Sequence, residues 1–121
     1  MGSYDPRDVR SDARLTRIVR AVGSRKHKAY VHDRYPAGSS VMTGWDGGSK
    51  DEWYVVRGDH AEFLPLAPDS NRMGDPFGQR KVLPEFPAGA DAVVECGVFC
   101  GKPAMPRVYF PESAAVRSEA R

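Results

Sequence analysis

The sequence predicts an α+β fold in which one basic N-terminal helix packs on or beside a mostly antiparallel sheet of about six short strands. Two observations lead to this fold. An apolar stripe at helical spacing is confined to about residues 7–22, and the later apolar runs are short and separated by turn residues. The 12 glycines and 10 prolines favour many turns over a few long helices. The 121 residues, 1–121, are expected to form a single domain, whose sheet could curl into a half-barrel.

The helix is expected over about residues 7–22. Leu15, Ile18 and Val22 recur at spacings of three and four, as on one face of an α-helix. Gly23 is suited to end the helix, because glycine readily adopts the left-handed conformation of a C-terminal cap. The arginines lie mostly away from the apolar stripe: Arg7, Arg10, Arg14, Arg17 and Arg20.

A β-rich body is expected over residues 26–110. Strands are predicted over residues 26–33, 39–45, 52–57, 60–64, 92–100 and 107–110, with a shorter one at 82–83. The first is expected to be edge-like, because its apolar residues lie in a charged stretch. The dipeptide Asp46-Gly47 lies between two apolar runs and is typical of a tight hairpin, so the second and third strands are expected to pair. Apolar residues alternate onto both faces of residues 52–57, which predicts a central strand buried on both sides.

A long polar loop is expected over residues 65–81, because this segment has no clear periodicity and contains several prolines, glycines and aspartates. Loops of this length in a compact domain are usually either functional or mobile. Residues 111–121 follow the last strand and are expected to be a frayed tail.

Positive charge is concentrated at the N-terminal end. Residues 1–34 contain nine lysines and arginines against four acidic residues, whereas residues 35–121 contain nine against twelve. A basic segment in front of a mildly acidic body favours a polyanionic partner or an acidic protein surface, although charge on an exposed helix often serves solvation alone. The candidate binding residues are Arg14, Arg17, Arg25, Lys26, Lys28 and Tyr30, of which the tyrosine could stack on bases.

The two cysteines, Cys96 and Cys100, lie four residues apart in the most apolar run. In a continuous strand they would share a face at a separation of about 13 Å, at about 3.3 Å per residue. That separation excludes a disulfide and a shared metal ion unless the strand bends sharply at Gly97. The three histidines show no recognised ligand spacing, so we expect core cysteines, no metal and no cofactor. A small Cys/His enzyme is a third hypothesis for the function, with Cys100, which lies near Lys102, or Cys96 as its nucleophile and a histidine as its base.

No apolar run approaches the roughly 18 residues that would span a membrane, and the charged start lacks a secretory pattern. We therefore expect a cytoplasmic protein without membrane contact, in which both cysteines stay reduced.

Two short motifs, Trp45-Asp46-Gly47-Gly48-Ser49 and Phe99-Cys100-Gly101-Lys102, resemble a pattern in small uncharacterised bacterial proteins, some of them on mobile elements. The resemblance covers about residues 28–110 and implies no activity. The leading hypothesis is a non-catalytic protein-binding module, of an accessory or inhibitor type that would suit a phage or plasmid. The alternative is nucleic-acid binding through the basic N-terminal segment.

Overall fold

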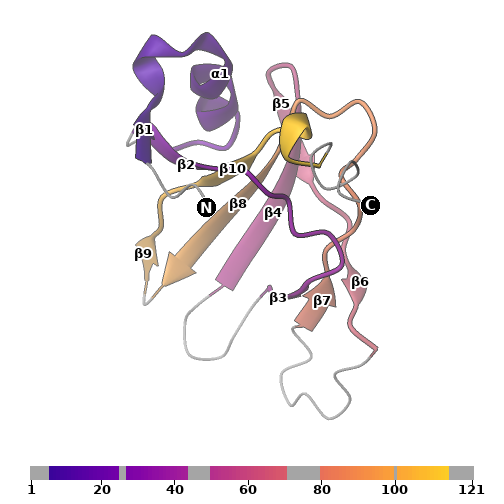
Figure 1. Cartoon of the computed structure of the whole chain (residues 1–121). Helices are drawn as coiled ribbons and strands as arrows, with labels where there is room; N and C mark the ends of the chain where they lie inside the picture. The colour runs from indigo at the N-terminus through magenta and orange to yellow at the C-terminus, as the bar shows by residue number, and fades with distance from the viewer. Residues whose placement is uncertain (1–5, 25–26, 44–49, 71–79, 100, 115–121) are drawn as a thin grey trace.

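The computed structural model describes residues 6–24, 27–43, 50–70, 80–99 and 101–114, and its mixed α+β architecture is rich in short strands (Figure 1). The elements are, in chain order, β1 (Pro6–Asp8), η1 (Val9–Ser11), α1 (Ala13–Ala21), β2 (Lys28–His32), β3 (Ser40–Met42), β4 (Lys50–Arg57), β5 (His60–Phe63), β6 (Ala67–Pro68), β7 (Arg80–Val82), β8 (Ala92–Phe99), β9 (Lys102–Pro103) and β10 (Arg107–Tyr109). Here η1 is a single turn of 3-10 helix. The α+β class is confirmed.

The main sheet has the order β1-β2-β10-β8-β4-β5, with β9 paired to β8. Strands β2 and β10 run parallel, and the other neighbours are antiparallel. A smaller sheet has the order β3-β7-β6. The mostly antiparallel arrangement is therefore confirmed. The predicted half-barrel is not confirmed, because the described strands of the main sheet end in two separate edges, β1 and β5.

The helix is shorter than the apolar stripe predicts, because the residues before it belong to the sheet. Residues 6–8 pair with β2, and the backbone nitrogen of Val9 donates to the carbonyl of His27. Asp12 is extended and caps α1, since its carboxylate accepts from the backbone nitrogens of Arg14 and Leu15. At the other end Gly23 has a φ of +78°, as expected of a C-terminal cap. The predicted start of the helix at residue 7 is therefore wrong: residues 7 and 8 belong to β1, residues 9–11 form the 3-10 turn η1, and the α-helix begins at Ala13.

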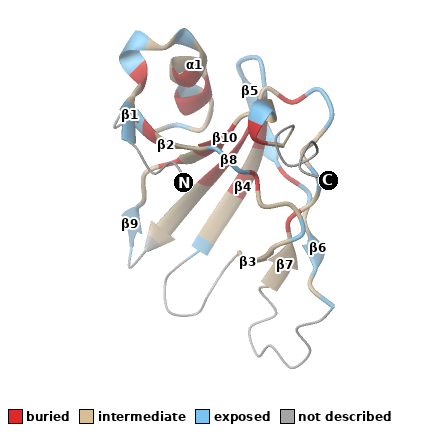
Figure 2. Cartoon of the chain, viewed as in Figure 1, coloured by how far each residue is buried: buried red, intermediate tan, exposed pale blue. Residues whose placement is uncertain are grey.

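Buried residues are concentrated in α1 and in the central strands of the main sheet (Figure 2), and their side chains form one core on each face of that sheet. The helix-side core consists of Val9, Leu15, Ile18, Val19, Ala29, Val56, Ala92, Val94 and Val108. The loop-side core consists of Tyr35, Trp53, Val55, Leu64, Leu83, Ala90, Val93 and Tyr109. Because neighbours on β4 alternate between the two cores, this strand is central and buried on both sides, as predicted.

Two strand pairings differ from the prediction. Strand β2 is not an edge, because it lies between β1 and β10. Strand β3 pairs with β7 in the smaller sheet, whereas β4 pairs with β5 and β8, so the hairpin predicted between β3 and β4 is wrong. The turn itself, residues 44–49, lies outside the described residues.

The predicted loop 65–81 is ordered into strands at both of its described ends, β6 and the start of β7, while residues 71–79 lie outside the described residues. The predicted tail starts with a helical turn at residues 111–114, in which Ser113 is buried and its hydroxyl donates to the carbonyl of Phe110 at 2.9 Å. The tail prediction is therefore wrong for these four residues, and residues 115–121 lie outside the described part of the chain.

Candidate apolar binding cavity

The helix is too short to cover the whole of its side of the sheet. Nine helical residues span about 14 Å, whereas the eight residues of β4 or β8 span about 26 Å. Helix α1 packs against Val56, Ala92 and Val94, which lie together toward one end of these two strands. The other end of the same face carries Glu52 and Cys96, which are register neighbours.

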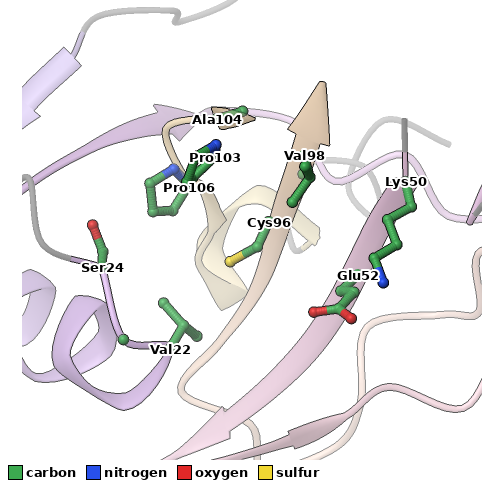
Figure 3. A pocket seen from close by; sticks show the side chains of 11 residues that line it. Val22, Ser24, Lys50, Glu52, Cys96, Val98, Pro103, Ala104 and Pro106 are labelled. Carbon is green, nitrogen blue, oxygen red and sulfur yellow. The ribbon is translucent and has the colours of Figure 1, made fainter. Parts of the chain in front are cut away.

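A cavity of about 400 Å³ occupies this remaining part of the face (Figure 3). One wall is residues 22–24, where α1 ends, and a second is residues 96–98 of β8. A third wall comes from Pro103, Ala104 and Pro106, which follow the β8–β9 turn. Most of the lining is apolar, and the volume is in the range of small-molecule and side-chain pockets.

The polar side of the cavity belongs to β4. Glu52 and Lys50 line it, and the lysine is exposed. The Tyr54 hydroxyl donates to Glu52 Oε1 at 2.7 Å, which fixes the orientation of the carboxylate. Burial and this hydrogen bond raise the pKa of Tyr54 to about 12, so the hydroxyl remains a donor at neutral pH. Glu52 thus presents a fixed carboxylate beside an apolar space.

Cys96 lies between the helix-side core and the cavity, and its sulfur points away from the strand toward the space beside α1 (Figure 3). It is a free, half-buried thiol, so it belongs to the cavity lining as much as to the core that the sequence predicted. Burial raises its pKa to about 11, and the negative charges of Glu52, Glu95 and Asp51 contribute to the rise. A thiol that stays protonated at neutral pH is a poor nucleophile, which weighs against Cys96 in the Cys/His enzyme hypothesis. Cys100 lies outside the described residues.

Arg14, the first of the predicted binding residues, is used within the fold. Its guanidinium lies 3.3 Å from a carboxylate oxygen of Glu112 and 4.0 Å from the ring centroid of Phe110. It also donates to the carbonyl of Asp91 at 3.4 Å. These contacts attach α1 to the segment that follows β10 and to the residue that precedes β8, so Arg14 has a role in packing the helix.

The other predicted binding residues do not form one surface. Ala29 packs in the helix-side core, so its neighbours on β2, Lys28 and Tyr30, face the opposite side of the sheet. Arg17 is on α1 and lines a different hollow. Arg25 and Lys26 lie outside the described residues. Of the described candidates, Arg17 therefore lies on the helix, whereas Lys28 and Tyr30 lie on the opposite face of β2.

A buried polar cluster on the loop side was not predicted. Glu95 is only 8% exposed, and its carboxylate lies 3.3 Å from a guanidinium nitrogen of Arg107 on β10. In the sheet register it lies between Trp53 and Arg107. Burial and a hydrogen bond with Asp51 raise the pKa of Glu95 to about 8, although Arg107 opposes the rise. Glu95 therefore holds its proton to a higher pH than an ordinary glutamate does.

Within the described residues, no group of three histidine, cysteine, aspartate or glutamate side chains is placed to hold a metal ion. None of the helices in the described part of the chain is both long and apolar enough to cross a membrane. No family model matches the chain, and neither the curated proteins nor the solved structures include a significant match.

Proposed function

We propose that the chain is a non-catalytic binding module, and that the helix-side cavity receives an apolar side chain of a protein partner. The observation that favours this function most is the uncovered part of the helix-side face, a mostly apolar space of about 400 Å³. An apolar anchor that fills such a pocket commonly contributes a large share of the binding free energy at a protein interface.

The polar groups define what should accompany the apolar anchor. Tyr54 uses one oxygen of Glu52, which leaves the other oxygen able to accept a further hydrogen bond. The partner segment should therefore combine a bulky apolar side chain with a donor, such as an amide or a cationic group, placed to reach Glu52. Cys96 takes the role of an apolar lining residue rather than a nucleophile, consistent with its raised pKa.

An accessory or inhibitory protein is the form of binding module that we favour, acting in the cytoplasm and encoded on a phage or plasmid. Such proteins need no catalytic groups of their own. Nucleic-acid binding is the alternative function. It predicts that nuclease treatment removes whatever the protein captures.

The test is a pull-down from the host's lysate with three forms of the tagged protein, each with and without nuclease. Val98→Trp places an indole at the lining of the cavity, at a half-buried position of β8. Ala88→Trp makes a comparable change at an exposed turn that does not line the cavity. Circular dichroism establishes that both variants are folded before the comparison.

We expect a protein that resists nuclease and is recovered with the wild type and with Ala88→Trp, but is lost with Val98→Trp. Recovery that is equal for both variants would refute the cavity as the interface. Recovery that disappears with nuclease would favour nucleic acid as the partner. A small apolar compound bound in native mass spectrometry of the purified protein would contradict a protein segment as the occupant.

A further inference from the structure

A second hollow, of about 720 Å³, lies beside the exposed side of α1 and is lined by three arginines. Arg10 comes from η1, while Arg17 and Arg20 come from α1. Asp59, in the turn between β4 and β5, is the acidic residue of the lining. We call this hollow the arginine groove. It is separate from the apolar cavity, with which it shares no lining residue among those described.

The helix places these arginines together because of its periodicity. Leu15, Ile18 and Val19 point into the helix-side core, so residues 17 and 20, three apart, lie on the side away from it. Arg10 precedes the helix by one turn and is oriented by Asp8, whose carboxylate it contacts at 2.7 Å. Three arginines thus line one groove, and the guanidinium of Arg10 is already bound by both oxygens of Asp8.

Arg17 carries the feature that points to a ligand. Its Nε is buried and has no hydrogen-bond partner. Among the described residues, no carboxylate oxygen lies within 4.0 Å of Arg17 or Arg20. A buried N–H without an acceptor is destabilising, so this position favours any group that supplies one.

We propose that the arginine groove binds a phosphate group. The guanidinium of an arginine presents parallel N–H donors that match two oxygens of a phosphate, and Arg17 lines the groove with a guanidinium whose Nε has no acceptor. Both carboxylate oxygens of Asp8 bind the guanidinium of Arg10, so the excess positive charge comes from Arg17 and Arg20 against Asp59, and it favours an anion over a neutral ligand. Thr16 does not contribute a donor, because its hydroxyl donates to the carbonyl of Val9.

The phosphate could belong to a small phosphorylated molecule or to a nucleic-acid backbone, and the chemistry in the groove is the same for both. The site differs from the basic surface predicted from the sequence, because it contains Arg10 and Arg20 and excludes Arg14, Lys28 and Tyr30. It is also independent of the proposed protein-binding cavity.

The experiment is an NMR titration that observes the arginine Nε–Hε resonances of the full chain. The probes are inorganic phosphate and a single-stranded oligonucleotide of ten thymidines, each added to the wild type, Arg17→Gln and Arg34→Gln. Arg34 is exposed and does not line the groove, so its variant controls for the loss of one positive charge. Amide spectra establish that each variant keeps the fold.

We expect phosphate to shift the Arg17 resonance, and Arg17→Gln to weaken binding about tenfold or more, since a charge-assisted fork is lost. Arg34→Gln should leave phosphate affinity within about twofold of the wild type, because an exposed charge outside the lining of the groove is screened by salt. Arg17→Lys keeps the charge without the fork and should also weaken binding.

Equal phosphate affinity in Arg17→Gln and Arg34→Gln would overturn the proposal, as would the absence of binding by both probes. Tighter binding of the oligonucleotide than of phosphate, with strong dependence on salt, would identify the nucleic-acid backbone as the source. Equal affinities for the two probes would identify a small phosphorylated molecule. Val98→Trp should bind phosphate normally, which separates this proposal from the function proposed for the cavity.

Discussion

Replacing Glu95 by glutamine should change how the stability of the protein depends on pH. Glu95 lies on β8 with Asp51 of β4 and Arg107 of β10 around its carboxyl group. Its pKa rises from an ordinary 4.5 to about 8, first because of burial and then because of Asp51. Glutamine has nearly the same shape and can still donate a hydrogen bond to Asp51, but it does not titrate.

Whether stability rises or falls with pH depends on which state, folded or unfolded, holds the proton of Glu95 more tightly. Between pH 4.5 and about 8 the folded protein keeps the proton on Glu95, whereas the unfolded chain has lost it. Folding is therefore favoured at low pH by this group, and its contribution is lost as the pH rises through that interval. Each pH unit of this interval corresponds to about 1.4 kcal/mol, so the contribution of Glu95 to the free energy of unfolding changes by at most about 5 kcal/mol. The coupling of Glu95 to Asp51 should keep the measured value below this limit.

The assay is urea unfolding of the wild type and of Glu95→Gln at a series of pH values from 4 to 9. The free energy of unfolding of the variant, minus that of the wild type, should increase steadily with pH and level off above about pH 8. Glu85→Gln, at an exposed position, is the matched control and should show a small difference that does not change with pH. A pH-independent difference for Glu95→Gln would refute the assignment of a protonated Glu95.

Two further predictions concern the helix-side core and the cavity. Leu15→Ala should reduce the free energy of unfolding by about 2–5 kcal/mol in urea, because Leu15 is fully buried between α1 and the sheet. A loss of less than about 1 kcal/mol would contradict the packing of α1 on the sheet. In a Cys100→Ser background, alkylation of Cys96 by iodoacetamide should accelerate continuously up to about pH 11, in line with its pKa. A rate that levels off near pH 8.5, the range of an ordinary thiol, would contradict the effect of its surroundings.

Local patterns predicted most of the elements but not their partners. The apolar runs at residues 52–57, 92–100 and 107–110 correspond to β4, β8 and β10, because short buried strands are apolar in any topology. Strand β3 was assigned to the wrong neighbour, since pairing depends on contacts far apart in the sequence. For the same reason the local pattern predicts helix at residues 7 and 8, which belong to β1 and pair with β2.

The cavity could not be predicted because its walls come from segments far apart in the chain, around Val22, Cys96 and Pro103. The one sequence feature related to the cavity is Cys96, and its position in the most apolar run predicts a core residue rather than a cavity-lining one. Glu95 was a missed signal, since a carboxylate within a strand that is buried on both faces requires partners. The role of Arg14 in packing depends on Glu112 and Phe110, almost a hundred residues away, and no local pattern indicates it.

The measurement that tests the proposed function most directly is site-specific photo-crosslinking in the host. A benzophenone amino acid at position 50, which is exposed and lines the cavity, places the reactive group beside the cavity without filling it, and the same residue at position 88 is the control on an exposed turn. The proposal predicts a crosslinked protein at position 50 and none at position 88. A crosslink of equal yield at both positions, or at position 88 alone, would contradict the cavity as the site where this protein binds its partner.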